Sequence, residues 1–354
     1  MWRSSHAAWS RPAIIGLGML LGHLAAPEMA SGQGCMPVRF TSAALGGQQA
    51  SFLQAREWQI GVSARRVATD KFFVGTREME DSAPFGEPLN LRLNSLDLSF
   101  TYATSERFSL TLTAPLAYST IENTQADHLR HQASTTGVGD INLVGSVWLA
   151  APTRHPNGNV SLGLGIKAPT GSNHVMGDVH DSLSNVSRAP LVAAVQRGDG
   201  GWAVLLQGQA FQRLFPRASF YVSGSYSVSL RRHSDVFRSP GLLYAVPDVY
   251  SARLGLAYAL MAGPGLSVSL GGRIDGTPVR NLVGGKTDFF RSAGYTLFLD
   301  PGLSLQHGPN QFTLSVPVRV HHDYVSMLLS TGKTRTGKGG VSDYVIYAGY
   351  SRRF

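Results

Sequence analysis

The sequence is poor in cysteine, in charge and in long apolar runs, and each shortage excludes a class of protein. Its one cysteine allows no intramolecular disulfide, so other interactions must hold the fold together. Charged residues make up 15% of the chain, compared with about 25% in a typical soluble domain. The apolar stretch Ala13–Ala26 is shorter than the roughly 20 residues that a membrane-spanning helix needs. A disulfide-stapled fold and a bundle of membrane-spanning helices are therefore excluded.

Glycine and aromatic residues are abundant instead. The chain has 40 Gly, 16 Phe and 12 Tyr, a mixture that suits many short strands and tight turns. Twelve segments alternate apolar and polar side chains, which is the pattern of strands with two different faces. Each is about ten residues long, the length that a tilted strand needs to cross a bilayer. We predict an all-β fold, a transmembrane antiparallel up-and-down β-barrel of about 12 strands.

The twelve segments span residues 56–67, 90–102, 107–118, 139–149, 159–168, 201–213, 219–230, 251–260, 265–275, 294–305, 311–320 and 342–354. The clearest of them is SFYVSGSYSVSL, residues 219–230. In segment 90–102 the apolar parity shifts at Asn94 and Ser95, which predicts a β-bulge there.

The connections between these segments alternate in length. Five short ones cover residues 103–106, 150–158, 214–217, 261–264 and 306–309, and six long ones cover 68–89, 119–138, 169–200, 231–250, 276–293 and 321–342. Outer-membrane barrels have short periplasmic turns and long extracellular loops, whereas a soluble sandwich has no reason for this asymmetry. The stretch Ala189–Gln196 is apolar enough to be a strand. We place it in the third long loop, because a thirteenth strand would break the even count.

The last segment resembles the closing strand and assembly signal of bacterial outer-membrane barrels. One of its faces is apolar and ends at the free C-terminus; it carries Tyr344, Ile346, Ala348, Tyr350 and Phe354. We predict that this strand closes the barrel and that the barrel-assembly machinery recognises it. The alternative is an edge strand of a soluble sandwich.

The N-terminus has the three parts of an export signal. Arg3 and Arg11 supply positive charge, Ala13–Ala26 an apolar core and MASGQ a cleavage zone of small residues. We predict a signal peptide over 1–32, a short periplasmic leader over 33–54 and the barrel over 55–354, located in the outer membrane. Cys35 follows the cleavage zone and leaves lipidation open as an alternative.

Charged residues on the predicted lumen face concentrate late in the chain. They are Arg253, Arg273, Asp275, Asp300 and Arg319, with Asp97, Arg92, Asp140 and Lys167 elsewhere in the chain. Arg253 and Arg273 are equally far from the turn between their strands, so we expect them to face each other. One interpretation is an ion-pair network that rigidifies the barrel. The other is an anion-attracting constriction, since rings of Arg or Lys select anions in pores.

The sequence offers little support for catalysis, metal binding or nucleic-acid binding. The loop segment HVMGDVHDS holds His174, Asp178, His180 and Asp181, but loop histidines at such spacing are more often solvated, and we predict no metal and no cofactor. No histidine lies mid-strand beside a serine and a third partner, so we predict no enzyme. The net charge of +9 is not gathered on an aromatic-bearing face. Membrane lipid and anionic lipopolysaccharide are therefore the expected partners, and nucleic acid is not.

Several stretches, among them TTGVGDINLVGSVWL, NVSLGLGIKAPTGSNHVMGD and DYVIYAGYSRRF, resemble a family of uncharacterised bacterial outer-membrane β-barrel proteins. More distantly, the chain is similar to outer-membrane proteins of the meta-pathway of phenol degradation and to channels for hydrophobic substrates such as the long-chain fatty acid transporters. This resemblance implies small aromatic or apolar compounds as cargo. We predict a passive channel for small solutes; the alternatives are a non-conducting structural or surface-loop barrel and, less favoured, an outer-membrane enzyme.

Overall fold

The computed structural model describes residues 52–79, 90–239, 242–261, 265–284, 288–329 and 332–354. Regular structure in these residues is β-strand, apart from one short 3-10 helix, η2 (Ala193–Val195). No helix in the described part is long and apolar enough to cross a membrane, a finding that concerns helices alone. The predicted signal peptide, Cys35 and most of the predicted leader lie outside the described residues.

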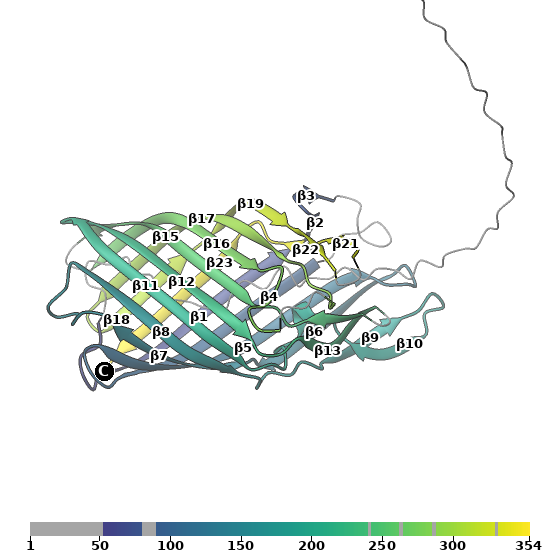
Figure 1. Cartoon of the computed structure of the whole chain (residues 1–354), viewed down its shortest axis with the longest axis horizontal. Coiled ribbons are helices and arrows are strands. Elements are labelled where there is room, and N and C mark those ends of the chain that lie inside the picture. Colours follow the sequence, from purple (N-terminus) through teal and green to yellow (C-terminus); the bar gives the residue numbers. More distant parts are fainter. Residues whose placement is uncertain (1–51, 80–89, 240–241, 262–264, 285–287, 330–331) are drawn as a thin grey trace, which may run out of the picture.

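Twelve antiparallel strands form a closed barrel in the described residues, as the sequence predicts (Figure 1). Ten are continuous: β1 (Trp58–Thr69), β4 (Asn90–Ala103), β5 (Phe108–Thr124), β8 (Gly158–Ala168), β11 (Ala203–Phe215), β12 (Ala218–Ser229), β15 (Val249–Met261), β16 (Leu266–Thr277), β17 (Gly294–His307) and β23 (Val345–Arg353). Two are interrupted, β6 (Arg130–Val138) with β7 (Ile141–Trp148), and β18 (Asn310–Ser315) with β19 (Val318–Tyr324). Strands adjacent in the chain are neighbours in the sheet, and β23 returns to β1.

The first and last strands close the barrel. Their register runs from Gln59 opposite Arg353 to Val67 opposite Val345. Beyond the last strand residue, the amide of Phe354 donates to the carbonyl of Trp58 at 2.9 Å, and the two rings stack with centroids 4.1 Å apart. Backbone pairing at the seam therefore continues to the final residue of the chain.

Each strand interruption has a local cause. Pro317 separates β18 from β19, because proline has no amide hydrogen to give to a neighbouring strand. Between β6 and β7, the amide of Gly139 still donates to the carbonyl of Pro115 at 2.7 Å. The next amide but one, that of Ile141, donates instead to the hydroxyl of Thr170 at 2.9 Å. The break between β6 and β7 therefore lies where the barrel wall contacts the connection that follows β8.

The short turns lie at one end of the barrel with the C-terminus, and the long connections lie at the other (Figure 1). We call these the turn end and the loop end. The long connections carry β2 (Lys71–Val74), β3 (Arg77–Glu78), β9 (Met176–His180), β10 (Val186–Pro190), β13 (His233–Ser239), β14 (Leu242–Ala245), β20 (Ser326–Leu328), β21 (Thr334–Thr336) and β22 (Lys338–Val341). The second predicted loop is largely strand, because β5 and β6 pair with each other as far as Thr124 and Arg130. Ala189–Gln196 belongs to the third long connection, as predicted, and adds no strand to the barrel.

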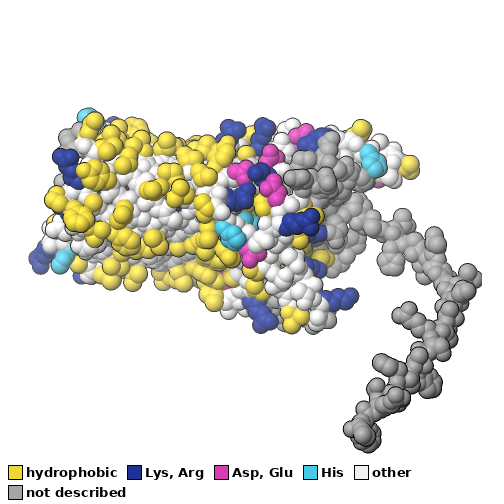
Figure 2. All heavy atoms as spheres, turned by 90° about the horizontal axis from the view of Figure 1, so that it is seen from above, with side chains coloured by type: hydrophobic (Ala, Val, Ile, Leu, Met, Phe, Trp, Pro, Cys, Tyr) yellow, Lys and Arg dark blue, Asp and Glu magenta, His cyan; other side chains and the backbone are white. Residues whose placement is uncertain are grey.

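Apolar side chains face outward along the barrel and polar ones face inward. On the face that Figure 2 shows, hydrophobic side chains cover the length of the barrel as a broad band, and charged side chains gather near its two ends. Ile60, Phe100, Leu162 and Leu254 are among the exposed residues of this band. Lipid would cover such a surface, whereas water would not stabilise it.

The predicted bulge at Asn94 and Ser95 is wrong. The pairing of β4 with both of its neighbours is continuous through these two residues. The apolar parity shifts because Leu91 and Leu93 face inward and are buried, whereas Arg92 faces outward. The chemistry of the two faces inverts along a regular strand, so the expectation that Arg92 faces the lumen is also corrected.

We expect Phe354→Ala to weaken the seam, because it removes a stacked aromatic pair worth about 0.5–1.5 kcal/mol beyond the area that it buries. The measurement is urea unfolding in detergent micelles, together with the fraction of protein that migrates as a folded band in unheated gels. Phe215→Ala, at the more exposed turn-end Phe215, is the matched control. Equal losses in the two variants would contradict a special role for Phe354 in closing the barrel.

Candidate functional site: the barrel lumen

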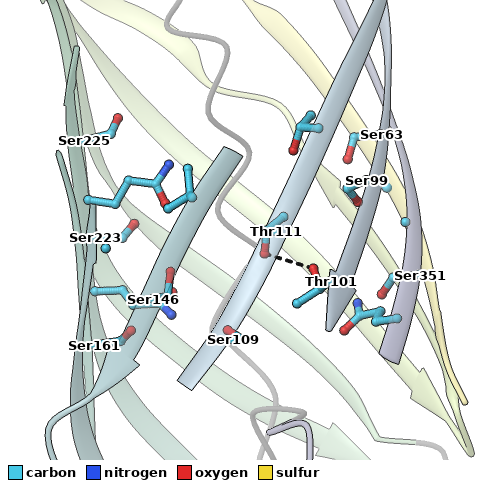
Figure 3. A pocket seen from close by; sticks show the side chains of 18 of the residues that line it. Ser63, Ser99, Thr101, Ser109, Thr111, Ser146, Ser161, Ser223, Ser225 and Ser351 are labelled. Atoms are coloured by element: carbon cyan, nitrogen blue, oxygen red, sulfur yellow. Dashed lines mark hydrogen bonds between the residues drawn. The ribbon is translucent and has the colours of Figure 1, made fainter. Parts of the chain in front are cut away.

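The turn-end half of the lumen is a polar cavity of about 380 Å³. Its lining comes from inward-facing residues of most of the barrel strands, and Figure 3 shows serine and threonine side chains around it. Examples are Ser63, Thr101, Ser146 and Ser223. We call this cavity the vestibule. Small hydroxyl side chains leave space and offer hydrogen bonds, so the vestibule suits water and small solutes.

An aromatic group lies at the turn end of the vestibule. Phe52, which precedes the first strand, packs edge-on against Trp148 at 5.1 Å between centroids and tilted against Phe211 at 5.7 Å. Trp148 and Phe211 come from β7 and β11 and also contact each other. Phe52, which falls in the predicted leader, therefore contributes its side chain to the lining of the lumen.

The loop-end half of the lumen holds an apolar cluster, which we call the plug cluster. The connection between β8 and β11 contributes Leu191, Ala194 and Val195, each at most 9% exposed. Five barrel strands contribute inward-facing partners, which are Val67, Leu91, Leu93, Ile121, Phe298, Val345 and Tyr347. Since residues of one loop segment belong to the same cluster as inward-facing residues of five strands, this loop occupies the lumen at that level.

Polar contacts hold residues 191–195 in place; we call these residues the plug segment. The Gln196 side chain donates to the carbonyls of Leu191 at 2.8 Å and Val175 at 3.1 Å, and it accepts from the amide of Val175 at 2.8 Å. The hydroxyl of Thr135 on β6 donates to the carbonyl of Val195 at 2.7 Å. The segment is thus tied both to its own loop and to the barrel wall.

Lys167 anchors the base of the same loop. Its ammonium group forms ion pairs with Asp140 at 3.1 Å and with Asp199. Asp140 lies at the break between β6 and β7, and it also accepts the amide of Gly171 at 3.0 Å. The predicted lumen residue Lys167 therefore joins the break between β6 and β7 to the two ends of the connection between β8 and β11.

Three of the predicted lumen arginines lie in one row. Strand registers place Arg253 opposite Arg273, Arg273 opposite Phe298, and Phe298 opposite Arg319. The expected juxtaposition of Arg253 and Arg273 on neighbouring strands is thus observed. Phe298 stands between Arg273 and Arg319, so the row has an apolar gap.

Each arginine of the row has its own carboxylate. Arg253 forms an ion pair with the fully buried Asp300 at 3.3 Å. Arg273 forms one with Asp275 at 2.9 Å and donates to the Tyr347 hydroxyl at 2.8 Å. Like charges on facing residues repel, and the two paired carboxylates relieve that repulsion.

The third arginine, Arg319, pairs outside the barrel strands. It forms an ion pair with Asp343, which also pairs with Lys71 at 3.0 Å, and its guanidinium lies over the ring of Phe73 at 4.8 Å. Burial of Asp343 opposes ionisation, but hydrogen bonds from Lys71 and Arg319 outweigh it and hold the pKa of this carboxyl below its usual value. Asp97, by contrast, lines the vestibule and is buried.

The loop segment HVMGDVHDS is not a single cluster. The Asp181 carboxylate accepts from Asn185 and from two loop amides, and these bonds lower its pKa. Asp178 lies 3.6 Å from Arg188, and His174 is exposed. His180 alone turns toward the tip of the β5–β6 hairpin, where its ring stacks on His131 at 3.6 Å.

Sequence reasoning missed the plug cluster. Its wall residues lie on the strand face that is polar elsewhere, as Leu91 and Leu93 show. The signal was the parity shift in β4, which marks apolar residues that face the lumen. Contacts between these residues and a distant loop segment are tertiary and leave no local pattern.

No protein-family model matches the chain, and no curated protein matches it. Among solved structures, an outer-membrane channel from Pseudomonas putida F1 is similar with a TM-score of 0.59 and 16% identity, over 88% of this chain and 100% of that one. A FadL homologue from Pseudomonas aeruginosa has a TM-score of 0.38 and 11% identity over 86% and 91% of the two chains. The toluene transporter TodX of P. putida has a TM-score of 0.42 and 9% identity over 87% and 92%. The first of these establishes a shared fold, so the predicted resemblance to outer-membrane barrels is confirmed at the level of the fold.

We expect Arg273→Ala to destabilise the barrel by about 3–5 kcal/mol, because it leaves the buried carboxylate of Asp275 without its cation. The side chains of this pair are only 5% and 9% exposed. Urea unfolding in micelles measures the loss. Arg66→Ala, at an exposed position of β1, removes the same side chain from the outer face and is the control. A loss no larger than that of the control would mean that the ion pair does not stabilise the wall.

Proposed function

We propose that this chain is a passive outer-membrane channel for small solutes, exported through residues 1–32 and inserted by the barrel-assembly machinery. The observation that carries the proposal is the division of the lumen. A polar vestibule leads from the turn end to a level that a loop segment occupies, rather than to a wall of barrel side chains. A loop can change its position while the barrel stays closed, so a passage can form without unfolding any strand.

Small uncharged solutes, apolar or aromatic, are the class that the loop-end half favours. A solute that passes the plug cluster contacts residues such as Val67, Leu91 and Ile121. Contact with such a surface favours apolar solutes by roughly 25 cal/mol per Å² removed from water. An ion would have to lose its hydration there without compensation.

The arginine row argues against strong anion selectivity. Arg253, Arg273 and Arg319 are each paired with a carboxylate, so their charges are compensated close by. We therefore propose that the predicted pore-lining charges, Arg253, Arg273, Asp275, Asp300, Arg319, Asp97 and Lys167, act chiefly as wall and loop anchors rather than as a selectivity filter.

A non-conducting barrel whose surface loops do the work is the second candidate. The observation that favours it is the firm attachment of the plug segment through Gln196 and Thr135. Phe52, which packs against Trp148 in the lining of the vestibule, also takes up space at the turn end. An outer-membrane enzyme is the least favoured candidate, and we propose no catalytic residue.

Loosening the plug cluster discriminates between the two candidates. We expect the double variant Leu191→Ala/Val195→Ala to raise single-channel conductance in planar bilayers several-fold over a low wild-type value, because it opens space in the cluster. Leu183→Ala is the matched control, since Leu183 lies in the same connection and is 81% exposed.

Uptake measurements complete the test. Cells that express the wild-type chain should take up a small uncharged aromatic compound faster than cells without it, and the double variant should be faster still. The channel would be ruled out if the double variant showed no conductance and if cells with the wild-type chain took up the compound no faster than cells without it. The non-conducting barrel would then remain.

A further inference from the structure

At the loop end, two hairpins that are distant in sequence bring together side chains of the types that bind metal ions. The β5–β6 hairpin supplies Asp127 from its turn and His131 from β6, and β9 supplies His180. One potential ligand atom from each residue lies within 4.8 Å of the other two. The Nε2 atom of His131 is 2.8 Å from a carboxylate oxygen of Asp127, and the imidazoles of His131 and His180 stack with centroids 3.6 Å apart.

The surroundings hold these side chains together. The Gln125 side chain accepts the amide of His180 at 2.6 Å and donates to the carbonyl of Asp178 at 3.4 Å, so the hairpin tip is joined to β9. The Asp127 carboxylate also accepts the amide of Leu129 at 3.1 Å. These contacts of the backbone and of the Gln125 side chain therefore hold the three side chains close to one another.

The Asp127 side chain is only 1% exposed, whereas that of His131 is 23% exposed. A carboxylate removed from water needs a cation beside it. A protonated His131 can supply that charge, while a neutral His180 needs no counter-charge and has its Nδ1 atom 3.3 Å from the Gln125 side-chain oxygen. A divalent ion bound by the carboxylate and the two rings would supply the positive charge with both imidazoles deprotonated.

We propose that Asp127, His131 and His180 form a binding site for a divalent transition-metal ion of the zinc class. Two imidazole nitrogens and one carboxylate oxygen are a common ligand set for Zn²⁺, and they disfavour Ca²⁺ and Mg²⁺, which prefer all-oxygen sites. Ligand distances of about 2.0–2.2 Å place tetrahedral donor atoms roughly 3.4 Å apart. The two rings lie nearly parallel, with an interplanar angle of 9°, so the side chains must rotate before their nitrogens converge on one ion. Water takes the fourth position.

The site would link the β5–β6 hairpin to the connection that carries the plug segment. β9 and η2 belong to the same connection between β8 and β11, so a bound ion restrains that loop at a point outside the lumen. The binding of the ion does not depend on whether the barrel conducts.

The test is titration of tag-free, refolded full-length chain in detergent with ZnCl2 by calorimetry, and with CoCl2 by visible absorption. We expect one ion per chain and the d–d absorption of a four-coordinate Co²⁺ site. His131→Ala, His180→Ala and Asp127→Asn should each weaken Zn²⁺ binding at least ten-fold. Binding should also weaken on acidification, because ligating imidazoles must be deprotonated.

His174→Ala and His155→Ala are the matched controls. Both histidines are exposed, the first in the same long connection and the second in a turn at the opposite end. They should bind Zn²⁺ as the wild type does. The site is overturned if the wild type binds no Zn²⁺, if Ca²⁺ competes equally, or if the ligand variants keep wild-type affinity. Heat-modifiable migration of every variant shows whether a loss of binding reflects a loss of fold.

Discussion

The structure depends on one constraint: in a bilayer, the backbone amides and carbonyls of a strand have no water to bind. A sheet that crosses lipid must therefore pair every edge, which a closed barrel does and an open sheet does not. The seam between β1 and β23 meets this requirement up to Phe354. Within the hydrophobic band, closure turns the outward side chains toward lipid, and along the whole barrel it makes the inward side chains neighbours in one narrow lumen. The polar vestibule, the paired arginines and the plug cluster are consequences of that geometry.

Inside a closed barrel, each polar group must find water or a partner. The turn-end half uses space and small hydroxyl side chains. At mid-height the larger charges form ion pairs, Arg273 with Asp275 on the same strand and Arg253 on β15 with Asp300 on β17. The loop-end half uses apolar residues that a returning loop covers. These three solutions follow one another along the barrel axis, so the chemistry of the lumen changes with depth although the strands are regular.

The sequence contains enough to predict the barrel but not the contents of its lumen. Alternation of period two and alternating loop lengths are local properties, and they predicted the strand count and the placement of Ala189–Gln196 outside the barrel strands. The facing of Arg253 and Arg273 followed from their equal distance to a turn. The plug cluster and the contact between His180 and His131 could not be predicted from the sequence. Each brings together segments that are distant in the chain, and no local sequence pattern shows which distant segments meet. Arg92 was misplaced for the same reason.

The inversion along β4 connects these points. On the turn-end part of the strand, Leu98 and Phe100 face outward and Asp97 faces inward; on the loop-end part, Leu91 faces inward and Arg92 outward. A strand keeps its alternation when it leaves the membrane, but the solvents on its two faces exchange roles: water replaces lipid outside, and the plug cluster replaces water inside. A parity shift without a bulge therefore indicates two things at once, the level where the hydrophobic band ends and the level where the lumen becomes apolar. In this chain both lie near Asn94 and Ser95, so the plug cluster begins where the outer face of the barrel becomes polar.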